Sequence, residues 1–333
     1  MSVTIKNIAK IAGVTPNTVS RALRNKEGVN KETAEKIHQI ASMMGYTPNI
    51  MAQSLVLKKT RTIGLAATEI KNPYQTEFIA ELILQLKEYG YHLITSEHSG
   101  NSGDTAISGL LSRKVDGLIV GSVSDIPDEL RFWKNIENAN NSQTPVVIFG
   151  EGRTSLIDNV NRNYRRCAEI MTSHLIKRKY SEIVFFSAYN KGGRADGYFE
   201  AMEKAGLAKN AKWFKAGTGS MESGRNDILR YLDENKKLPQ AIIAQNDLMA
   251  IGIMAGLTSK GYKVPDDTAV VGFDNIEFGQ YTNPPLTSIG FSNKEVAQTI
   301  LKLLFERIDG ERTEPKEIMA EPILKIRSSC GSK

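Results

Sequence analysis

The sequence predicts an α/β protein with an all-α head. We expect a helix-turn-helix unit and a hinge helix at the N-terminus, followed by two doubly wound parallel-sheet subdomains. From residue 61 onwards, short apolar strand candidates alternate with amphipathic helix patterns, and the strands form two groups. Before residue 61, helix caps and apolar residues at helical spacing indicate three short helices.

The excess positive charge of the chain is confined to its first sixty residues. They carry nine lysines and arginines against three acids, whereas the rest of the chain carries 34 bases and 34 acids. A basic segment of this kind is expected to meet a polyanion such as DNA. The alternative is a basic tail that only keeps the protein in solution.

Length and composition limit the other possibilities. The 333 residues are enough for two or three domains, and 41% of them are hydrophobic. No apolar stretch is long enough to span a bilayer, and the N-terminus lacks the apolar core of a signal peptide. Two distant cysteines, Cys167 and Cys330, are typical of a reducing compartment. We therefore expect a cytoplasmic protein without a membrane partner.

Two helices begin and end at recognisable residues near the N-terminus. Thr4 is expected to cap a helix over residues 5–12, which Gly13 ends by adopting a left-handed conformation. Thr15 is expected to cap a second helix, with Pro16 in its first turn, where a missing N–H costs nothing. Two short helices joined by a tight turn predict a helix-turn-helix.

The second helix of such a unit enters the major groove of DNA. Asn17 is suited to pair with adenine, and Arg21 to pair with guanine through two hydrogen bonds. A third helix, capped by Asn30 and closed by Gly45, is expected to support the pair. The alternative is a small helical bundle whose polar residues are incidental.

Capping residues at exposed helix starts also suit contacts with DNA phosphates. We expect Thr4, Thr18 and Asn30 to act in this way beside the free amides of their helices. Residues 50–60 form a short apolar helix candidate that is too short to be stable alone. Such a helix is expected to form against a partner, with Leu55 wedged into the minor groove.

Four motifs together resemble the head and hinge of the lactose/galactose repressor family of bacterial transcription regulators. They are IKNIAKIAGVT at 5–15, TVSRAL at 18–23, GYTPN at 45–49 and AQSL at 52–55. The resemblance implies a homodimer on a pseudo-palindromic, double-stranded DNA operator. It implies that Pro16, Asn17 and Arg21 in the recognition helix, and Asn49, Ala52 and Leu55 in the hinge, bind DNA. We add the helix cap Thr15 to this set of DNA-binding residues.

Strand and helix candidates alternate over the rest of the chain. Strands are expected at Thr62–Ala67, Tyr91–Ser96, Gly117–Ser122, Val146–Gly150, Glu182–Ala188, Ala241–Gln245, Ala269–Asp274 and Ile323–Arg327. Helices are expected at Phe78–Tyr89, Thr105–Ser112, Tyr164–Arg178, Asp196–Ala205, Gly224–Asn235, Leu248–Lys260 and Asn293–Arg307. Strands separated by helices predict parallel sheets, with a ligand site at the carboxyl ends of the strands.

The resemblance extends to this core and implies two subdomains of periplasmic-binding-protein type. The chain is expected to cross between them near Asn161, Phe291 and Pro322. The expected division is a helix-turn-helix domain at 1–48, a hinge at 49–60, an N-subdomain at 61–161 and 292–322, and a C-subdomain at 162–291 and 323–333. A small effector is implied between the two subdomains.

Candidate effector-binding residues follow the strands of this core. They are Tyr74, Gln75, Asn163, Arg194, Asn246 and Asp274. Arg194 resembles the arginine with which the family grips ligand hydroxyls or carboxylates, and its planar fork suits that task. Each has an alternative role: Tyr74 in packing, Asn246 as a helix cap, and Arg194 with Asp274 as a salt bridge. Asp247 is expected to have a structural role.

Basic residues near these positions bear on the class of effector. Arg153, Arg162, Lys191 and Arg194 would make the cleft basic, which favours an acidic or phosphorylated sugar. The alternative is that these side chains are simply solvated.

Motifs of catalysis and metal binding are not found in the sequence. It contains no phosphate-binding loop, no His-Glu-x-x-His site and no Gly-x-Ser-x-Gly elbow. We therefore expect no enzyme activity, no catalytic residue, no metal and no cofactor. A pure sugar-binding protein and a DNA-bending architectural protein are the other hypotheses. The resemblance implies instead a repressor of a carbohydrate-use operon whose operator affinity is controlled allosterically by a sugar.

Overall fold

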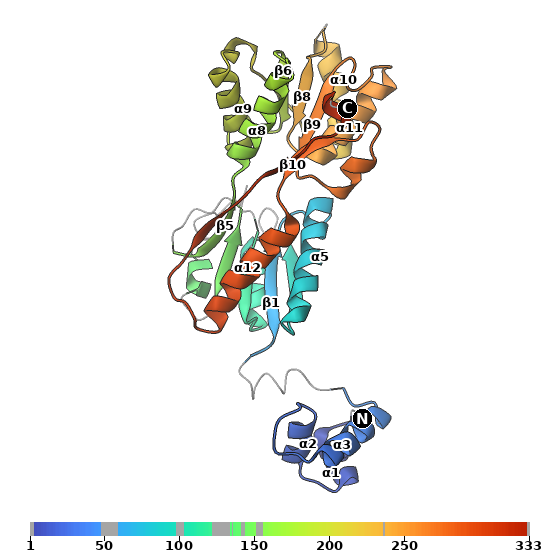
Figure 1. The fold of residues 1–333 in the computed structure, drawn as a ribbon, viewed down its shortest axis with the longest axis vertical. Helices are drawn as coiled ribbons and strands as arrows, with labels where there is room; N and C mark the ends of the chain where they lie inside the picture. Colours follow the sequence, from blue (N-terminus) through green and yellow to red (C-terminus); the bar gives the residue numbers. More distant parts are fainter. Residues whose placement is uncertain are drawn as a thin grey trace. The chain divides into compact units, whose positions relative to one another are not determined.

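The computed structural model describes residues 3–47, 59–97, 103–121, 134, 136–140, 144–150, 156–235 and 237–331. It divides into an N-terminal unit, Met1–Thr60, and a core unit, Arg61–Lys333 (Figure 1). The hinge candidates Asn49, Ala52 and Leu55, and the basic residue Arg153, lie outside the described residues.

Three helices form the N-terminal unit, or head: α1 (Ile5–Ala12), α2 (Pro16–Ala22) and α3 (Lys31–Met43). Their apolar faces meet in a small core in which Ile8, Val19 and Ile37 are completely buried. Gly13 ends α1 with a φ of 70°, the left-handed conformation that lets α2 begin three residues later. This is the predicted helix-turn-helix arrangement.

The first sheet of the core has six described strands in the order β11-β5-β4-β3-β1-β2, all parallel. Its strands are β1 (Thr62–Ala67), β2 (His92–Glu97), β3 (Gly117–Val120), β4 (Val146–Phe149), β5 (Asp158–Arg162) and β11 (Glu317–Ala320). Helices α5 (Pro73–Glu88) and α12 (Asn293–Ile308) pack on one face, and α6 (Gly103–Ser112) packs on the other.

The second sheet has six described strands in the order β12-β10-β9-β8-β6-β7. Its strands are β6 (Ile183–Ser187), β7 (Lys212–Lys215), β8 (Ala241–Ala244), β9 (Ala269–Phe273), β10 (Thr287–Gly290) and β12 (Ile323–Lys325). All described pairs are parallel except β10 with β12.

Helices cover both faces of the second sheet. One face packs on α8 (Tyr164–Lys177) and α9 (Gly193–Lys204), and the other packs on α10 (Met221–Glu234) and α11 (Asp247–Ser259). Short 3-10 helices η2 (Ala208–Asn210), η3 (Glu277–Tyr281) and η4 (Ser328–Cys330) complete this part of the chain. Helices on both faces of a mainly parallel sheet confirm the predicted doubly wound fold class.

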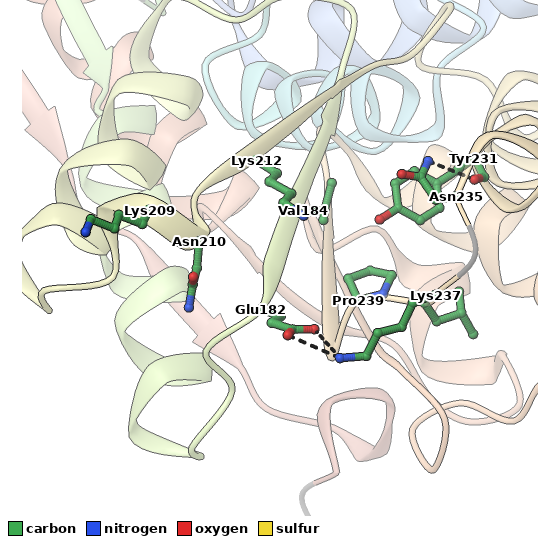
Figure 2. A pocket seen from close by; sticks show the side chains of 10 residues that line it. Glu182, Val184, Lys209, Asn210, Lys212, Tyr231, Asn235, Lys237 and Pro239 are labelled. Carbon is green, nitrogen blue, oxygen red and sulfur yellow. Dashed lines mark hydrogen bonds and ion pairs between the residues drawn. The ribbon is translucent and has the colours of Figure 1, made fainter.

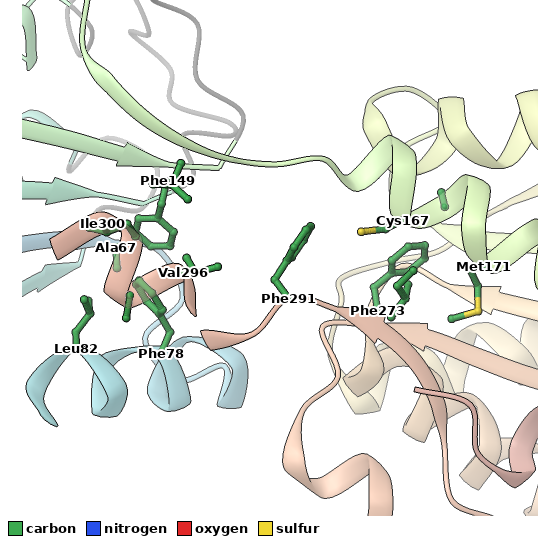
Figure 3. Packing of buried hydrophobic residues seen from close by; sticks show 14 of the residues in the cluster. Ala67, Phe78, Leu82, Phe149, Cys167, Met171, Phe273, Phe291, Val296 and Ile300 are labelled. Atoms are coloured by element: carbon green, nitrogen blue, oxygen red, sulfur yellow. The ribbon is translucent and has the colours of Figure 1, made fainter. Parts of the chain in front are cut away.

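Along the described chain, the backbone passes between the two sheets at three places: after β5, after β10 and after β11. Phe291 lies on the second of these connections, between a group of apolar side chains around Phe149 and another around Phe273 (Figure 3). One buried apolar cluster therefore runs through both sheets and past the connections that join them.

The eight strands expected from apolar runs are present, with small differences at their ends. The structure adds β5, β7, β10 and β11, which the apolar pattern does not predict. Strand β5 shows the reason, because its sequence DNVNR contains a single apolar residue, Val160. Its buried Asp158 is held by two hydrogen bonds from Arg312, at 2.8 and 2.9 Å. Asn161 donates a hydrogen bond to Glu317 on β11 at 2.9 Å.

Candidate DNA-binding and effector sites

The start of α2 presents a row of exposed side chains. Thr15 caps the helix by accepting a hydrogen bond from the Thr18 amide at 3.2 Å, and its hydroxyl lies 2.9 Å from the Thr18 hydroxyl. Pro16 occupies the first turn, where it removes no helical hydrogen bond. Asn17 is exposed and none of its side-chain atoms is engaged by another described residue. This end of α2 is therefore open to a base edge in a groove.

Two arginines, one in the last turn of α2 and one just after it, are held by neighbouring backbone groups. Arg21 donates a hydrogen bond to the carbonyl of Glu27, close to Gly28. Arg24, two residues after the end of α2, donates to the carbonyl of Ser20 in that helix at 2.9 Å. Arg21 would therefore exchange a bond to the following loop for one to DNA.

The residues expected to contact phosphates all act as caps or cap partners in the head. Thr4 and Asn7 form a capping box, and the Thr4 amide donates to Asn7 Oδ1 at 2.9 Å. Asn30 accepts from the Glu32 amide at 2.9 Å, and Thr18 is bonded to Thr15 as described above. Thr4 and Asn30 are exposed, so their caps place free helix amides at the surface of the head.

In the core, Arg162 is the last residue of β5 and is only 2% exposed. It donates a hydrogen bond to the phenol oxygen of Tyr74, which lies in the first turn of α5. Its Cζ lies 5.2, 4.9 and 5.6 Å from the ring centres of Tyr74, Phe149 and Tyr164. The guanidinium therefore sits inside a cage of three aromatic rings.

A second arginine lies at the carboxyl edge of the other sheet. Arg194 begins α9, and its Nη2 lies 3.3 Å from Asp274 Oδ1, just after β9. Its Cζ lies 3.8 Å from the centre of the Tyr164 ring and 5.3 Å from that of Phe273. Tyr164 thus contacts both arginines. We call Tyr74, Phe149, Arg162, Tyr164, Phe273, Arg194 and Asp274 the arginine cluster.

Burial shifts the ionisation of this cluster. Burial raises the pKa of Asp274, although the charges of Arg194 and Arg162 lower it. Burial also raises the pKa of Tyr74 against the opposing charge of Arg162, so the phenol stays neutral. Burial works against the charge of Arg162, but its interactions with Tyr164 and Tyr74, including the hydrogen bond to Tyr74, and the charge of Asp274 more than offset it, so the pKa of Arg162 lies above its ordinary value. The guanidinium therefore remains a buried cation.

The backbone at Asp274 adopts a left-handed conformation, with φ of 98°, and Asn275 follows with φ of 51°. Such values cost a non-glycine residue about 1–3 kcal/mol and cluster at functional sites. The strain turns the chain so that the carboxylate of Asp274 meets Arg194.

The other predicted effector residues have local partners. Asn163 caps α8 by accepting from the Arg166 amide at 2.9 Å, and Asn246 caps α11 by accepting from the Met249 amide at 2.8 Å. Gln75 is buried beside Tyr74, and its Oε1 has no hydrogen-bond partner in the described part of the chain. The structure therefore brings Tyr74, Arg194 and Asp274 into one cluster, while both asparagines cap helices.

Asp247 has the expected structural role beneath this site. It accepts hydrogen bonds from the Ser288 hydroxyl at 2.6 Å and from the Ile276 amide at 2.9 Å. Burial raises its pKa well above the ordinary value, and the charge of Asp274 adds to this. Asp247 thereby ties α11 to β10 and to the backbone after β9.

Arg162, Tyr164, Phe149 and Phe273 were not predicted to bind the effector. Arg162 and Tyr164 flank the end of β5, a strand that its polar sequence conceals. Of these four residues, only Arg162 was associated with the cleft from the sequence, because its side chain is basic. Lys191, which was also expected to make the cleft basic, is exposed.

A cavity of about 350 Å³ lies elsewhere, at the amino ends of β6, β7 and β8 (Figure 2). Its lining includes Glu182, Lys209, Lys212 and Lys237, and the ammonium of Lys237 lies 2.9 Å from Glu182. It contains no residue predicted to bind an effector, and its lysines are exposed. Ligands of doubly wound sheets bind at the opposite, carboxyl ends of the strands.

Within the described ranges, no helix is both long and apolar enough to cross a membrane. The same ranges hold no group of three or more His, Cys, Asp or Glu side chains arranged for a metal ion.

Comparisons with known proteins match both parts of the chain. Residues 4–49 match the family model "Bacterial regulatory proteins, lacI family", and residues 172–330 match "Periplasmic binding protein-like domain". Proteins named "HTH-type transcriptional repressor PurR" are 31% identical in Histophilus somni and 32% identical in Photobacterium profundum, over 98% of both chains. The fold resembles a lac repressor dimer bound to operator and anti-inducer (TM-score 0.84, 24% identity, 99% of both chains).

The relatives match 98% of the chain at 31% and 32% identity, and the two family models match residues of the head and of the core. The chain therefore belongs to the lacI family of bacterial regulatory proteins and is a DNA-binding transcription regulator controlled by a small-molecule effector.

Proposed function

We propose that this chain is a cytoplasmic, homodimeric repressor of a carbohydrate-use operon, and that it acts by binding rather than by catalysis. A sugar or sugar derivative bound between the two core subdomains sets its affinity for a pseudo-palindromic operator. The observation that carries the proposal is the arginine cluster, which joins the carboxyl ends of strands from both sheets.

The DNA half of the proposal rests on the head. Thr15, Pro16, Asn17 and Arg21 are the proposed groove contacts, because they lie at the exposed start and along the length of α2. Thr4, Thr18 and Asn30 are the proposed phosphate contacts. Asn49, Ala52 and Leu55 are the proposed hinge contacts in the minor groove, by analogy with the family.

The effector half rests on the core. Tyr74, Gln75, Asn163, Arg194, Asn246 and Asp274 are the proposed effector-binding residues. The two sheets and the three connections between them support subdomains close to 61–161 with 292–322 and 162–291 with 323–333, except that Arg162, the end of β5, belongs to the first sheet. Solved structures of similar fold carry titles that name cellobiose (24% identity) and ribose (23% identity, Enterococcus faecium). These titles support a sugar as the effector class here.

Coupling follows from the position of the cluster. Arg162 and Tyr74 come from the first sheet and its helices, whereas Arg194 and Asp274 come from the second. A ligand that contacts both sets binds one relative orientation of the subdomains better than another, and shifts the population toward it. In a dimer, this shift changes the spacing of the two hinges and hence the affinity for the operator.

Selection of binding sequences from random DNA, followed by gel shifts with a panel of sugars, tests both halves. We expect a two-fold symmetric site and a change in affinity with one sugar class. The double variant Asn17→Ala/Arg21→Ala should lose this site while its core still binds the sugar. Failure to select any specific sequence, with or without sugars, would overturn the proposal.

A further inference from the structure

We propose that the effector is a polyhydroxylated anion, a sugar acid or sugar phosphate, and that Arg162 is the residue that selects it. The inference rests on the proposed function, in which the effector binds at the arginine cluster. It infers the chemical class of that effector from buried charged and polar groups that have no ion-pair or hydrogen-bond partner in the described part of the protein.

Arg162 is a buried cation that forms no direct ion pair with a described carboxylate, and the charge of Asp274 raises its pKa only from beyond 4.0 Å. Its side chain is among the largest fully buried ones, and no described carboxylate oxygen lies within 4.0 Å of its nitrogens. Its contacts are the hydroxyl of Tyr74 and the faces of three aromatic rings. Ring faces and one hydroxyl offset only part of the several kcal/mol that burial of an unpaired charge costs. An anion would complete the site.

Three buried polar atoms in this region lack hydrogen-bond partners in the described part of the chain: Arg162 Nε, Arg194 Nε and Gln75 Oε1. Buried polar atoms are almost always bonded, so each of these atoms calls for a partner that a bound ligand would supply. Two of the atoms are charged donors and the third is an acceptor. A ligand with anionic oxygens for the guanidinium groups and a hydroxyl for Gln75 satisfies all three.

The carboxylates near the cluster have their own partners. Asp274 pairs with Arg194, and Asp247 accepts from Ser288 and Ile276. Glu77 accepts a hydrogen bond from the backbone of Glu277 at 3.0 Å, and burial raises its pKa. Glu69 is exposed, and it acts on Asp274 only through its charge. None of these groups forms an ion pair with Arg162.

The aromatic faces argue against a neutral sugar as the preferred ligand. Sugars are commonly held by stacking on an aromatic ring, but the rings of Tyr74 and Tyr164 each already have an arginine guanidinium over a face. A guanidinium recognises carboxylate and phosphate through paired, charge-assisted hydrogen bonds. Hydroxyl oxygens supply no charge for Arg162.

The test measures binding to the full-length protein by calorimetry, with compounds that differ in charge. Glucose is compared with glucuronate, gluconate and glucose 6-phosphate, galactose with galacturonate, and inorganic phosphate tests charge alone. We expect at least one hydroxylated anion to bind about 10–100-fold more tightly than its neutral counterpart, the worth of a charged hydrogen bond. The carboxylate and phosphate arms distinguish the two sources of charge. Tighter binding of a neutral sugar than of its acid would overturn the proposal.

Two variants separate selection from folding. Arg162→Gln should remove the preference for the anion, and Arg166→Gln, an exposed arginine on α8, should retain it. Arg162→Met should raise the melting temperature of the ligand-free protein, because it removes an unpaired buried charge while keeping the volume. A lower melting temperature would show that Arg162 is a structural core residue and would overturn the proposal. If none of the compounds binds, this melting temperature is the result that decides.

Operator binding distinguishes the two proposals. If neutral sugars but not acids change operator affinity, the proposed function stands and the anionic effector fails. If no specific operator exists, the proposed function itself fails, whatever the calorimetry shows.

Discussion

Arg194 and Asp274 form an ion pair at the carboxyl edge of the second sheet, with 3.3 Å between Nη2 and Oδ1. They are 80 positions apart in the sequence. The carboxylate reaches the guanidinium because Asp274 takes a left-handed backbone conformation, with φ of 98°. The pair therefore combines an electrostatic contact with backbone strain. Substitutions at Asp274 can distinguish the contribution of the ion pair from that of the strained backbone.

Asp274→Asn should be more stable than Asp274→Ala by about 1 kcal/mol. Both variants remove the carboxylate, but asparagine adopts left-handed backbone conformations more readily than alanine does. Urea unfolding of the two variants measures the difference. Equal stability would show that the left-handed backbone carries no strain. Both variants should lose effector response.

The buried carboxylate of Asp247 should make stability fall as the pH rises. Burial raises the pKa of Asp247 well above 3.8 in the folded chain, so between these values the folded state binds more protons than the unfolded state. The free energy of unfolding therefore decreases as the pH rises through this range. Asp247→Asn keeps the shape of the side chain and cannot ionise, so the decrease should become smaller.

Urea unfolding of the parent protein and of Asp247→Asn, measured at intervals of about half a pH unit between about pH 4.5 and 8, checks this prediction. The exposed Asp266→Asn is the matched control and should keep the parental slope. An unchanged slope in Asp247→Asn would contradict the assignment.

Breaking the ion pair between Asp158 and Arg312 should destabilise the first subdomain strongly. The carboxylate of Asp158 is completely buried and bonds to Arg312 and to the Lys316 amide, at 2.7 to 2.9 Å. Arg312→Met leaves this charge without its main partner, which costs about 3–5 kcal/mol for a buried pair. Lys237→Met breaks the exposed pair with Glu182 and should cost less than about 1 kcal/mol.

Urea unfolding measures both costs. The double variant Asp158→Asn/Arg312→Met should recover part of the loss, because it no longer buries an unpaired charge. If Arg312→Met matches Lys237→Met, the buried pair does not stabilise the fold.

The fold could be predicted where burial follows from apolar residues alone. Strands such as β1, β8 and β9 are short apolar runs that lie in the interior of a sheet, and their positions follow from the pattern. Strand β5 could not be predicted in this way. Its Asp158 is buried through Arg312, 154 residues later, and a single sequence does not indicate that pairing.

The same limit applies to the candidate site. Tyr74, Arg194 and Asp274 follow recognisable strands, so their place at a sheet edge was predictable. Arg162 ends β5 and Tyr164 follows it, and because this strand is not evident from sequence, the role of Arg162 as a caged cation appears only in three dimensions. Asn163 and Asn246 also follow strands, but their oxygens cap the next helices, a role that the same position allows.

Arg21 and Arg24 should differ in their contribution to operator binding, although they are only three residues apart in the sequence. Arg21 is expected to bind a guanine through two hydrogen bonds, at the expense of its bond to the Glu27 carbonyl. Arg24 lies just after α2, is bound to the Ser20 carbonyl of that helix, and is expected to add only charge. Arg21→Ala should therefore weaken specific binding by about 1–3 kcal/mol and relax preference at one base pair.

Gel shifts on the selected operator and on single-base variants of it, at two salt concentrations, compare the two arginines. Arg24→Ala should weaken binding to all sequences alike and mainly lower the salt dependence, because a charge that meets phosphate carries no sequence information. The opposite pattern, with base preference lost in Arg24→Ala and kept in Arg21→Ala, would mean that Arg24 leaves Ser20 to enter the groove and that Arg21 stays on its loop.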